Sequence, residues 1–216
     1  MGLVGWKGKL YQIVEFITML AVLQLMWIGL TLLGLVFFGI APATAGLFAS
    51  MRKRLNGEDD LKTLVNIYWK SYRKDFFDAN KIGITIIVVG YFIVLNIRLS
   101  MTMNGVPGLL MLSFMVMACI LYAIILLNIF SIFVHYELPF TRYFSVSLLM
   151  SISFPVQTIG AMLGLYGLYR VFLIIPGLLP FFGISVTVLF LTWVSSIMFK
   201  MKGNVDGSLL SENEGS

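Results

Sequence analysis

The residues that could do chemistry in this chain are few and scattered. His135 is the only histidine and lies two positions before Glu137, and Cys119 is the only cysteine. A zinc site needs three or four ligands, and neither a second histidine nor a usable thiol accompanies His135. A serine nucleophile needs a base within hydrogen-bonding reach, and no spacing here supplies one. We therefore expect no enzyme, no catalytic residue, no metal and no cofactor.

The composition is that of a membrane protein. Hydrophobic residues make up 59 % of the 216 residues and charged residues 12 %, and the mean hydropathy is +0.96. A soluble domain carries roughly 25 % charged residues. The net charge of +5 does not indicate nucleic acid, because the cations gather at the ends of apolar runs, where topology and anionic headgroups explain them.

Five apolar stretches are long enough to cross a bilayer, for which about 20 residues suffice. We expect an all-α polytopic membrane domain over residues 1–200, with a disordered tail over 201–216. Pro155 should kink the fourth span, and the reversal between spans four and five falls between Tyr166 and Gly183. The expected spans are 16–38, 82–98, 109–134, 144–168 and 175–199.

The polar interruption between the first two spans is the most distinctive part of the chain. It holds eight of the fifteen Lys/Arg residues: Arg52, Lys53, Arg54, Lys62, Lys70, Arg73, Lys74 and Lys81. Apolar side chains recur there at spacings of three and four, which indicates an amphipathic helix. We expect interfacial helices over 43–78 that contact the membrane surface or a partner. The candidate contact residues are Pro42, Arg52, Lys53, Arg54, Tyr68, Trp69, Tyr72, Arg73 and Phe76.

The distribution of cations predicts the topology. With the N-terminus outside and the C-terminus cytoplasmic, the outer segments hold Lys7, Lys9, Arg98 and Arg170, and the other eleven Lys/Arg residues are cytoplasmic. This satisfies the positive-inside bias. Lys7 and Lys9 argue modestly for the opposite placement of the N-terminus.

Small and amide residues inside the spans predict helix contacts. Gly160 and Gly164 form a G-x-x-x-G pair followed by Gly167, a spacing that lets helices approach closely. Their partner is either another helix of this bundle or another subunit. Asn128 and Gln157, like Gln24 and Asn96, seek partners across helices or line a sugar-sized polar path. No ionisable residue lies deep in a span, which argues against an ion-coupled transporter.

The segment 38–76 contains four consecutive sequence features. They are Phe38-Gly39-Ile40-Ala41-Pro42-Ala43-Thr44-Ala45-Gly46-Leu47-Phe48, the basic Arg52-Lys53-Arg54, the acidic Gly57-Glu58-Asp59-Asp60, and Tyr68-Trp69-Lys70-Ser71-Tyr72-Arg73-Lys74-Asp75-Phe76. Together they resemble the YesL family of Gram-positive integral membrane proteins. Asp75 stands where the family often has Asn, and Gly46 where it often has Ala.

The resemblance implies an association with carbohydrate transport. The implied role is a non-catalytic auxiliary subunit of an oligosaccharide ABC importer in the cell membrane. Its partners would be the two permease subunits and, indirectly, an ATPase and a sugar-binding protein. The alternative is a small stand-alone transporter or channel that works as an oligomer.

Overall fold

The structure, a computed structural model, describes the backbone of residues 6–214 and the side chains of residues 10–203. The described chain is all-α. The elements are α1 (Trp6–Leu33), α2 (Ile40–Leu55), α3 (Leu61–Lys74), α4 (Phe76–Thr102), α5 (Val106–His135), α6 (Phe140–Ser153), α7 (Pro155–Ile174), the short 3₁₀ helix η1 (Pro176–Leu178) and α8 (Leu179–Glu214).

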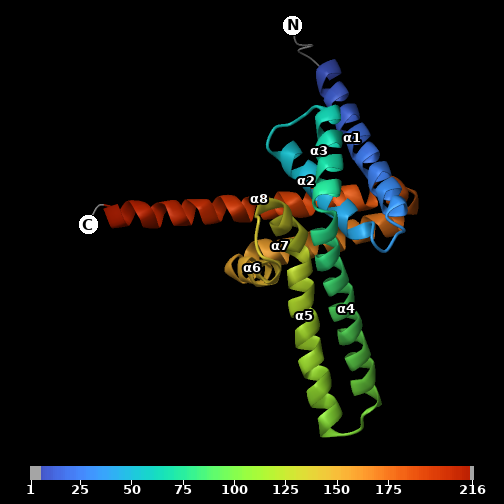
Figure 1. Cartoon of the computed structure of the whole chain (residues 1–216), viewed down its shortest axis with the longest axis vertical. Coiled ribbons are helices and arrows are strands. Elements are labelled where there is room, and N and C mark those ends of the chain that lie inside the picture. Colours follow the sequence, from blue (N-terminus) through green and yellow to red (C-terminus); the bar gives the residue numbers. More distant parts are fainter. Residues whose placement is uncertain (1–5, 215–216) are drawn as a thin grey trace.

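Five of these helices are long and apolar enough to span a membrane. They cover Leu10–Leu33, Phe76–Thr102, Val106–His135, Pro155–Ile174 and Pro176–Gly203. The predicted class, an all-α polytopic membrane protein, is confirmed. In Figure 1 these helices do not form one parallel bundle: α4 and α5 make a hairpin that projects away from the rest, and α8 crosses the molecule at a steep angle to it.

Two predicted boundaries near the N-terminal half are corrected. The first helix ends at Leu33 rather than at residue 38, because the chain makes a tight turn in which a Cβ on Gly34 would lie 2.3 Å from Gly39 Cα. The helix that follows starts at Ile40 rather than at residue 43, and most of its side chains are buried against other helices. Its small side chains let five other helices pack around it.

The predicted fourth span, 144–168, is also corrected. The chain breaks at Phe154 into α6 and α7, so Pro155 starts a helix instead of kinking one, as its missing N–H favours. The reversal before the last span lies at Ile175–Leu178, inside the predicted interval. Helix α8 continues to Glu214, so the predicted disordered tail is helical from Met201 to Glu214, since no proline interrupts the helix that leaves the last span.

The core lies around α2. Its buried residues contact α1 on one side and α4, α5 and α8 on the others, and α3 covers it as the second arm of a helical hairpin. One cluster of buried apolar side chains joins α1, α2, α3 and α8, and a second joins α2, α4, α5, α6, α7 and α8. Helices α2 and α8 both contribute to the two clusters, so together they connect the two halves of the protein.

Candidate functional site

Helix α2 buries a residue that the sequence assigned to a contact surface. Pro42 is fully buried, together with Ala43 and Leu47. A Cβ on Gly83 of α4 would lie 2.5 Å from Ala41 Cβ, which shows how closely the two helices approach. Pro42 therefore does not contact a partner or the membrane surface. It occupies the first turn of α2, where proline costs no hydrogen bond.

Two aromatic residues of the α3 stripe also lie inside the protein. Tyr68 is 0 % exposed, and its hydroxyl donates to the backbone carbonyl of Ala43 at 2.6 Å. The Tyr72 hydroxyl donates to the carbonyl of Leu30 at 3.1 Å. Burial raises the pKa of the Tyr68 hydroxyl and so keeps it protonated as a donor. Tyr68 and Tyr72 were predicted to contact the surface or a partner, and this prediction is wrong. Their hydroxyls instead form hydrogen bonds inside the protein, from α3 to α2 and from α3 to α1.

The rest of the predicted contact set lies nearer the surface. Phe76 is half-buried against Tyr72. Trp69 is 42 % exposed, and the Arg73 guanidinium lies 5.7 Å from the centre of its ring. Lys53 is exposed. Trp69, Arg73 and Lys53 remain predicted contact residues.

Arg54 lies at the turn between α2 and α3. It pairs with Asp59 and sits over the ring of Phe16 on α1, with 5.7 Å between the guanidinium carbon and the ring centre. The basic turn is therefore beside the first half of α1. The sequence pattern alone did not indicate this contact, because the two residues lie on different helices.

The predicted packing glycines separate into two kinds. A Cβ on Gly164 would lie 2.1 Å from the ring of Phe190, so this glycine packs α7 against α8. Gly160 and Gly167 have open space where a Cβ would be. One of the three glycines thus serves packing within the chain, and the other two lie on a face of α7 that the described chain leaves open.

Asn128 joins three helices. Its amide nitrogen donates to Ser151 Oγ on α6 at 2.8 Å, and its oxygen accepts from Ser195 Oγ on α8 at 3.0 Å. Gln157 is half-buried and directs its amide nitrogen to the sulfur of Met201, 3.0 Å away. These side chains satisfy one another, as buried polar groups in a membrane protein must.

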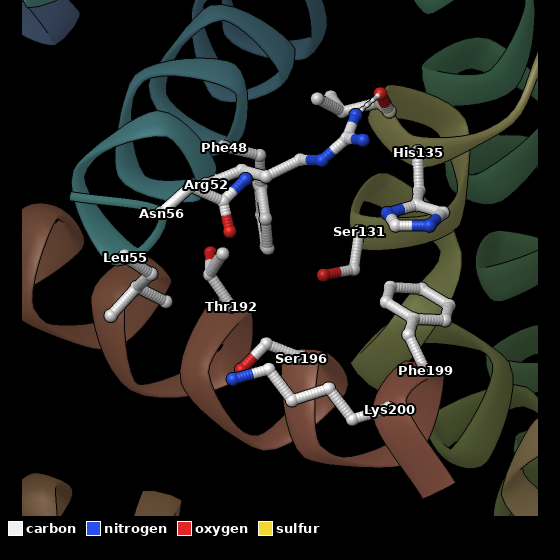
Figure 2. Close-up of a pocket in the computed structure, with 11 residues that line it drawn as sticks. Phe48, Arg52, Leu55, Asn56, Ser131, His135, Thr192, Ser196, Phe199 and Lys200 are labelled. Atoms are coloured by element: carbon white, nitrogen blue, oxygen red, sulfur yellow. Dashed lines mark hydrogen bonds between the residues drawn. The ribbon is translucent and has the colours of Figure 1, made fainter. Parts of the chain in front are cut away.

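A pocket of about 240 Å³ lies where α2, α5 and α8 meet. Figure 2 shows its lining, with the Ser131 hydroxyl and the Asn56 amide oxygen pointing into the space between the helices. The lining residues are Phe48, Arg52, Leu55, Asn56, Ser131, Val134, His135, Thr192, Ser196, Phe199 and Lys200. Of these, only Arg52 was a predicted site residue.

The pocket walls are held in place by contacts between helices. Arg52 donates from Nη1 to the backbone carbonyl of Val134 at 2.7 Å. The His135 ring stacks on Phe199, with 4.0 Å between ring centres. Among the described residues, no group of three or more His, Cys, Asp and Glu side chains lies close enough to hold a metal ion. The stacked histidine therefore has the environment of a packing residue.

The four-residue spacing of polar side chains on α5 and α8 could have indicated which residues line the pocket. Ser131 and His135 are four residues apart on α5, and Thr192, Ser196 and Lys200 repeat at the same interval on α8. Residues four apart lie on one face of a helix. The sequence does not show that these two faces meet Arg52, because that depends on how α2 inserts between α5 and α8.

The fold and these contacts define a multi-pass α-helical membrane protein built around a buried helix. Residues 20–97 match the family model described as a protein of unknown function, DUF624. The chain is 32 % identical to the uncharacterized protein YteU of Bacillus subtilis (strain 168) over 181 residues, which cover 84 % of this chain and 81 % of YteU. The chain belongs to the DUF624 family.

Two further Bacillus subtilis (strain 168) relatives support this membership. The uncharacterized protein YesV is 33 % identical over 178 residues, covering 81 % of this chain and 83 % of YesV. The uncharacterized protein YesL is 27 % identical over 181 residues, covering 84 % of this chain and 85 % of YesL. The predicted YesL-like family is thus confirmed. No solved structure matches the chain.

Proposed function

We propose that this protein is an auxiliary, non-catalytic membrane subunit of an oligosaccharide ABC importer and that it binds and stabilises the permease subunits. The observation that carries the proposal is the projecting α4–α5 hairpin (Figure 1). In the most apolar 18-residue window of α5, 0 % of the residues are buried inside the protein. Large side chains such as Phe92 and Phe114 are 61 % and 62 % exposed.

Helix association in membranes depends on close packing rather than on hydrophobicity, so a face made for a partner helix carries small residues or defined ridges. Helix α7 offers such a face, since Gly160 and Gly167 are open. Permease subunits are membrane proteins, whose spanning helices could occupy such a face. We propose that the α4–α5 hairpin and this face of α7 pack against them.

The arrangement of the amides favours this role over a stand-alone channel. A channel for polar solutes needs polar groups free along a path. The oxygen of Gln24 instead accepts from the backbone N–H groups of Ile184 and Ser185, at 3.1 and 2.8 Å. Asn96 donates to the Phe92 carbonyl of its own helix. Gln24, Asn96, Asn128 and Gln157 thus each have a hydrogen-bond partner within this chain.

Site-specific crosslinking tests the proposed surface. A photo-crosslinking amino acid in place of Phe92 or Phe114 should yield a covalent adduct with a permease subunit in cells that express the whole importer. Irradiated cells that carry the unmodified chain serve as the control. Adducts with a second copy of this chain, and none with a permease, would instead support the oligomeric transporter.

We also propose a topology in which the basic segment 39–81 and the end of α8 are cytoplasmic and the N-terminus is outside. The shared pocket supports the first part, because Arg52 and Lys200 line it together. The side of the N-terminus is the part of this topology that most needs a test, because Arg54 of the basic segment contacts Phe16 in the first half of α1. With Cys119→Ala as background, an impermeant thiol reagent applied to intact cells should label Gly2→Cys and leave Lys53→Cys unlabelled. Labelling of neither cysteine would place the start of α1 on the cytoplasmic side.

A further inference from the structure

The pocket between α2, α5 and α8 is lined by basic residues and by no acidic ones. None of its eleven lining residues is Asp or Glu, whereas two of them, Arg52 and Lys200, are basic. In Figure 2 the Lys200 side chain runs along the α8 side of the space. The acids Asp75, Asp78 and Glu137 line the adjoining groove instead, where Glu137 pairs with Lys74 and Asp78 with Lys81.

The Ser131 hydroxyl lines this pocket. The residue as a whole is only 5 % exposed, and its Oγ is accessible from the pocket space. Serines inside helices commonly donate to a carbonyl of the preceding turn, as Ser147 does to Tyr143. The Ser131 hydroxyl instead points into the space between the helices (Figure 2). A hydroxyl in this position can donate a hydrogen bond to a group that enters the pocket.

The partial negative charges of the helix C-termini at the pocket are smaller than the positive charge of its two basic side chains. The C-terminal turns of α2 and α5 lie at the pocket, and each contributes roughly half a negative charge. Arg52 offsets part of this by donating to the Val134 carbonyl. Two cationic side chains against roughly one unit of helix-end charge leave a positive balance of about one unit.

The size of the pocket limits the ligand. Its volume of about 240 Å³ is below the roughly 300–1,000 Å³ that is usual for drug-sized ligands. It is too small for an oligosaccharide and large enough for one compact anionic group. The pocket also lies at the ends of α5 and of the last apolar helix, where a membrane-spanning segment meets water and headgroups.

We propose that this pocket binds one phosphate group, held by Arg52, Lys200 and the Ser131 hydroxyl. Cationic donors and hydroxyls are the groups that bind phosphate oxygens in charge-assisted hydrogen bonds. The phosphate comes either from a soluble phosphate or from the headgroup of an anionic lipid. The proposal does not depend on the importer role, because the site lies within this chain.

The test is a calorimetric titration of the purified full chain in neutral detergent. The probes are inorganic phosphate and short-chain phosphatidic acid, with short-chain phosphatidylcholine as the zwitterionic control and constant ionic strength throughout. Ser131→Ala and Lys200→Gln should each weaken phosphate binding by about fivefold or more. Lys53→Gln is the matched control. It removes a cation from the same helix as Arg52, but from a side chain that does not line this pocket.

The two probes separate the sources of the ligand. Inorganic phosphate binding that both variants weaken supports a soluble phosphate, and binding of phosphatidic acid alone with the same pattern supports a lipid headgroup. The proposal would be overturned if neither inorganic phosphate nor phosphatidic acid bound. It would also be overturned if Lys53→Gln weakened binding as much as Lys200→Gln, because the attraction would then come from the charge of the whole surface.

Discussion

The hydroxyl of Tyr68 donates a hydrogen bond to the backbone carbonyl of Ala43, across 2.6 Å in a region that excludes solvent. This bond ties α3 to the buried helix α2. It explains why an amphipathic segment rich in cations does not lie free on the membrane surface. Its aromatic stripe is used to cover α2, and its opposite face carries the charges.

Tyr68→Phe removes this bond and keeps the ring. We expect the free energy of unfolding to fall by about 1 kcal/mol, the usual net value of a hydrogen bond. Thermal unfolding of the purified variant in detergent measures the change. Tyr91→Phe is the matched control, because Tyr91 is 65 % exposed, and it should leave the midpoint unchanged. Equal midpoints for the two variants would contradict a stabilising role of the Tyr68 bond.

The open and closed glycines of α7 should respond differently to a large side chain. Gly164→Leu places carbon atoms where Phe190 lies and should destabilise the fold by about 1–3 kcal/mol. Gly160→Leu meets open space and should leave the unfolding midpoint of the isolated chain unchanged. Under the proposed function it should reduce the yield of co-purified permease. Unchanged yield with Gly160→Leu would remove this face of α7 from the interface.

The junction at Asn128 should contribute more to stability than an amide that serves its own helix. Asn128→Leu leaves Ser151 and Ser195 without their amide partner. We expect a loss of about 1 kcal/mol, within the range found for hydrogen bonds between membrane helices. Asn96→Leu is the control, since Asn96 is only half-buried and its side chain donates within α4, to the Phe92 carbonyl. A larger loss for Asn96→Leu than for Asn128→Leu would contradict the assignment.

Asp60 should make the start of α3 sensitive to acid. Its carboxylate accepts from both the hydroxyl and the backbone N–H of Thr63, and these bonds lower the pKa of Asp60 below the ordinary value of 3.8. A carboxyl group with a lowered folded pKa stabilises the fold above its unfolded pKa, and the contribution is lost as the pH falls through the folded pKa.

Amide hydrogen exchange across residues 61–67 checks this prediction. Relative to Asp60→Asn, which caps the helix without titrating, the wild-type chain should lose protection as the pH falls below about 4. The same comparison at neutral pH shows the charged cap at full strength. An identical pH profile for the wild type and Asp60→Asn would contradict a role for the carboxylate charge.

The class of the fold could be predicted because apolar length is a property of single segments. The runs that became α1, α4, α5 and α8 can be read directly from the sequence, whereas the turn at Pro176 could be placed only within the interval from Tyr166 to Gly183. The break at Phe154 was misread as a kink, because a proline inside an apolar run is compatible with both.

The position of α2 could not be predicted from the sequence. Its Ala- and Gly-rich first half and basic end suit a helix at the membrane interface as well as a helix buried among others. Burial of Pro42 is decided by the neighbours that pack around it. The pocket depends on the same insertion, because Arg52, Ser131 and Lys200 come from three helices. Spacing within each helix hints at a face but does not say which faces meet.

Under the proposed function this protein works as part of a larger membrane complex. Affinity purification from native membranes in mild detergent, followed by mass spectrometry of the recovered proteins, is the decisive measurement. We expect two permease proteins in amounts near that of this chain, and less of both when Gly160→Leu alters the open face of α7. Recovery of this chain alone, as an oligomer of defined size, would rule out the auxiliary-subunit role.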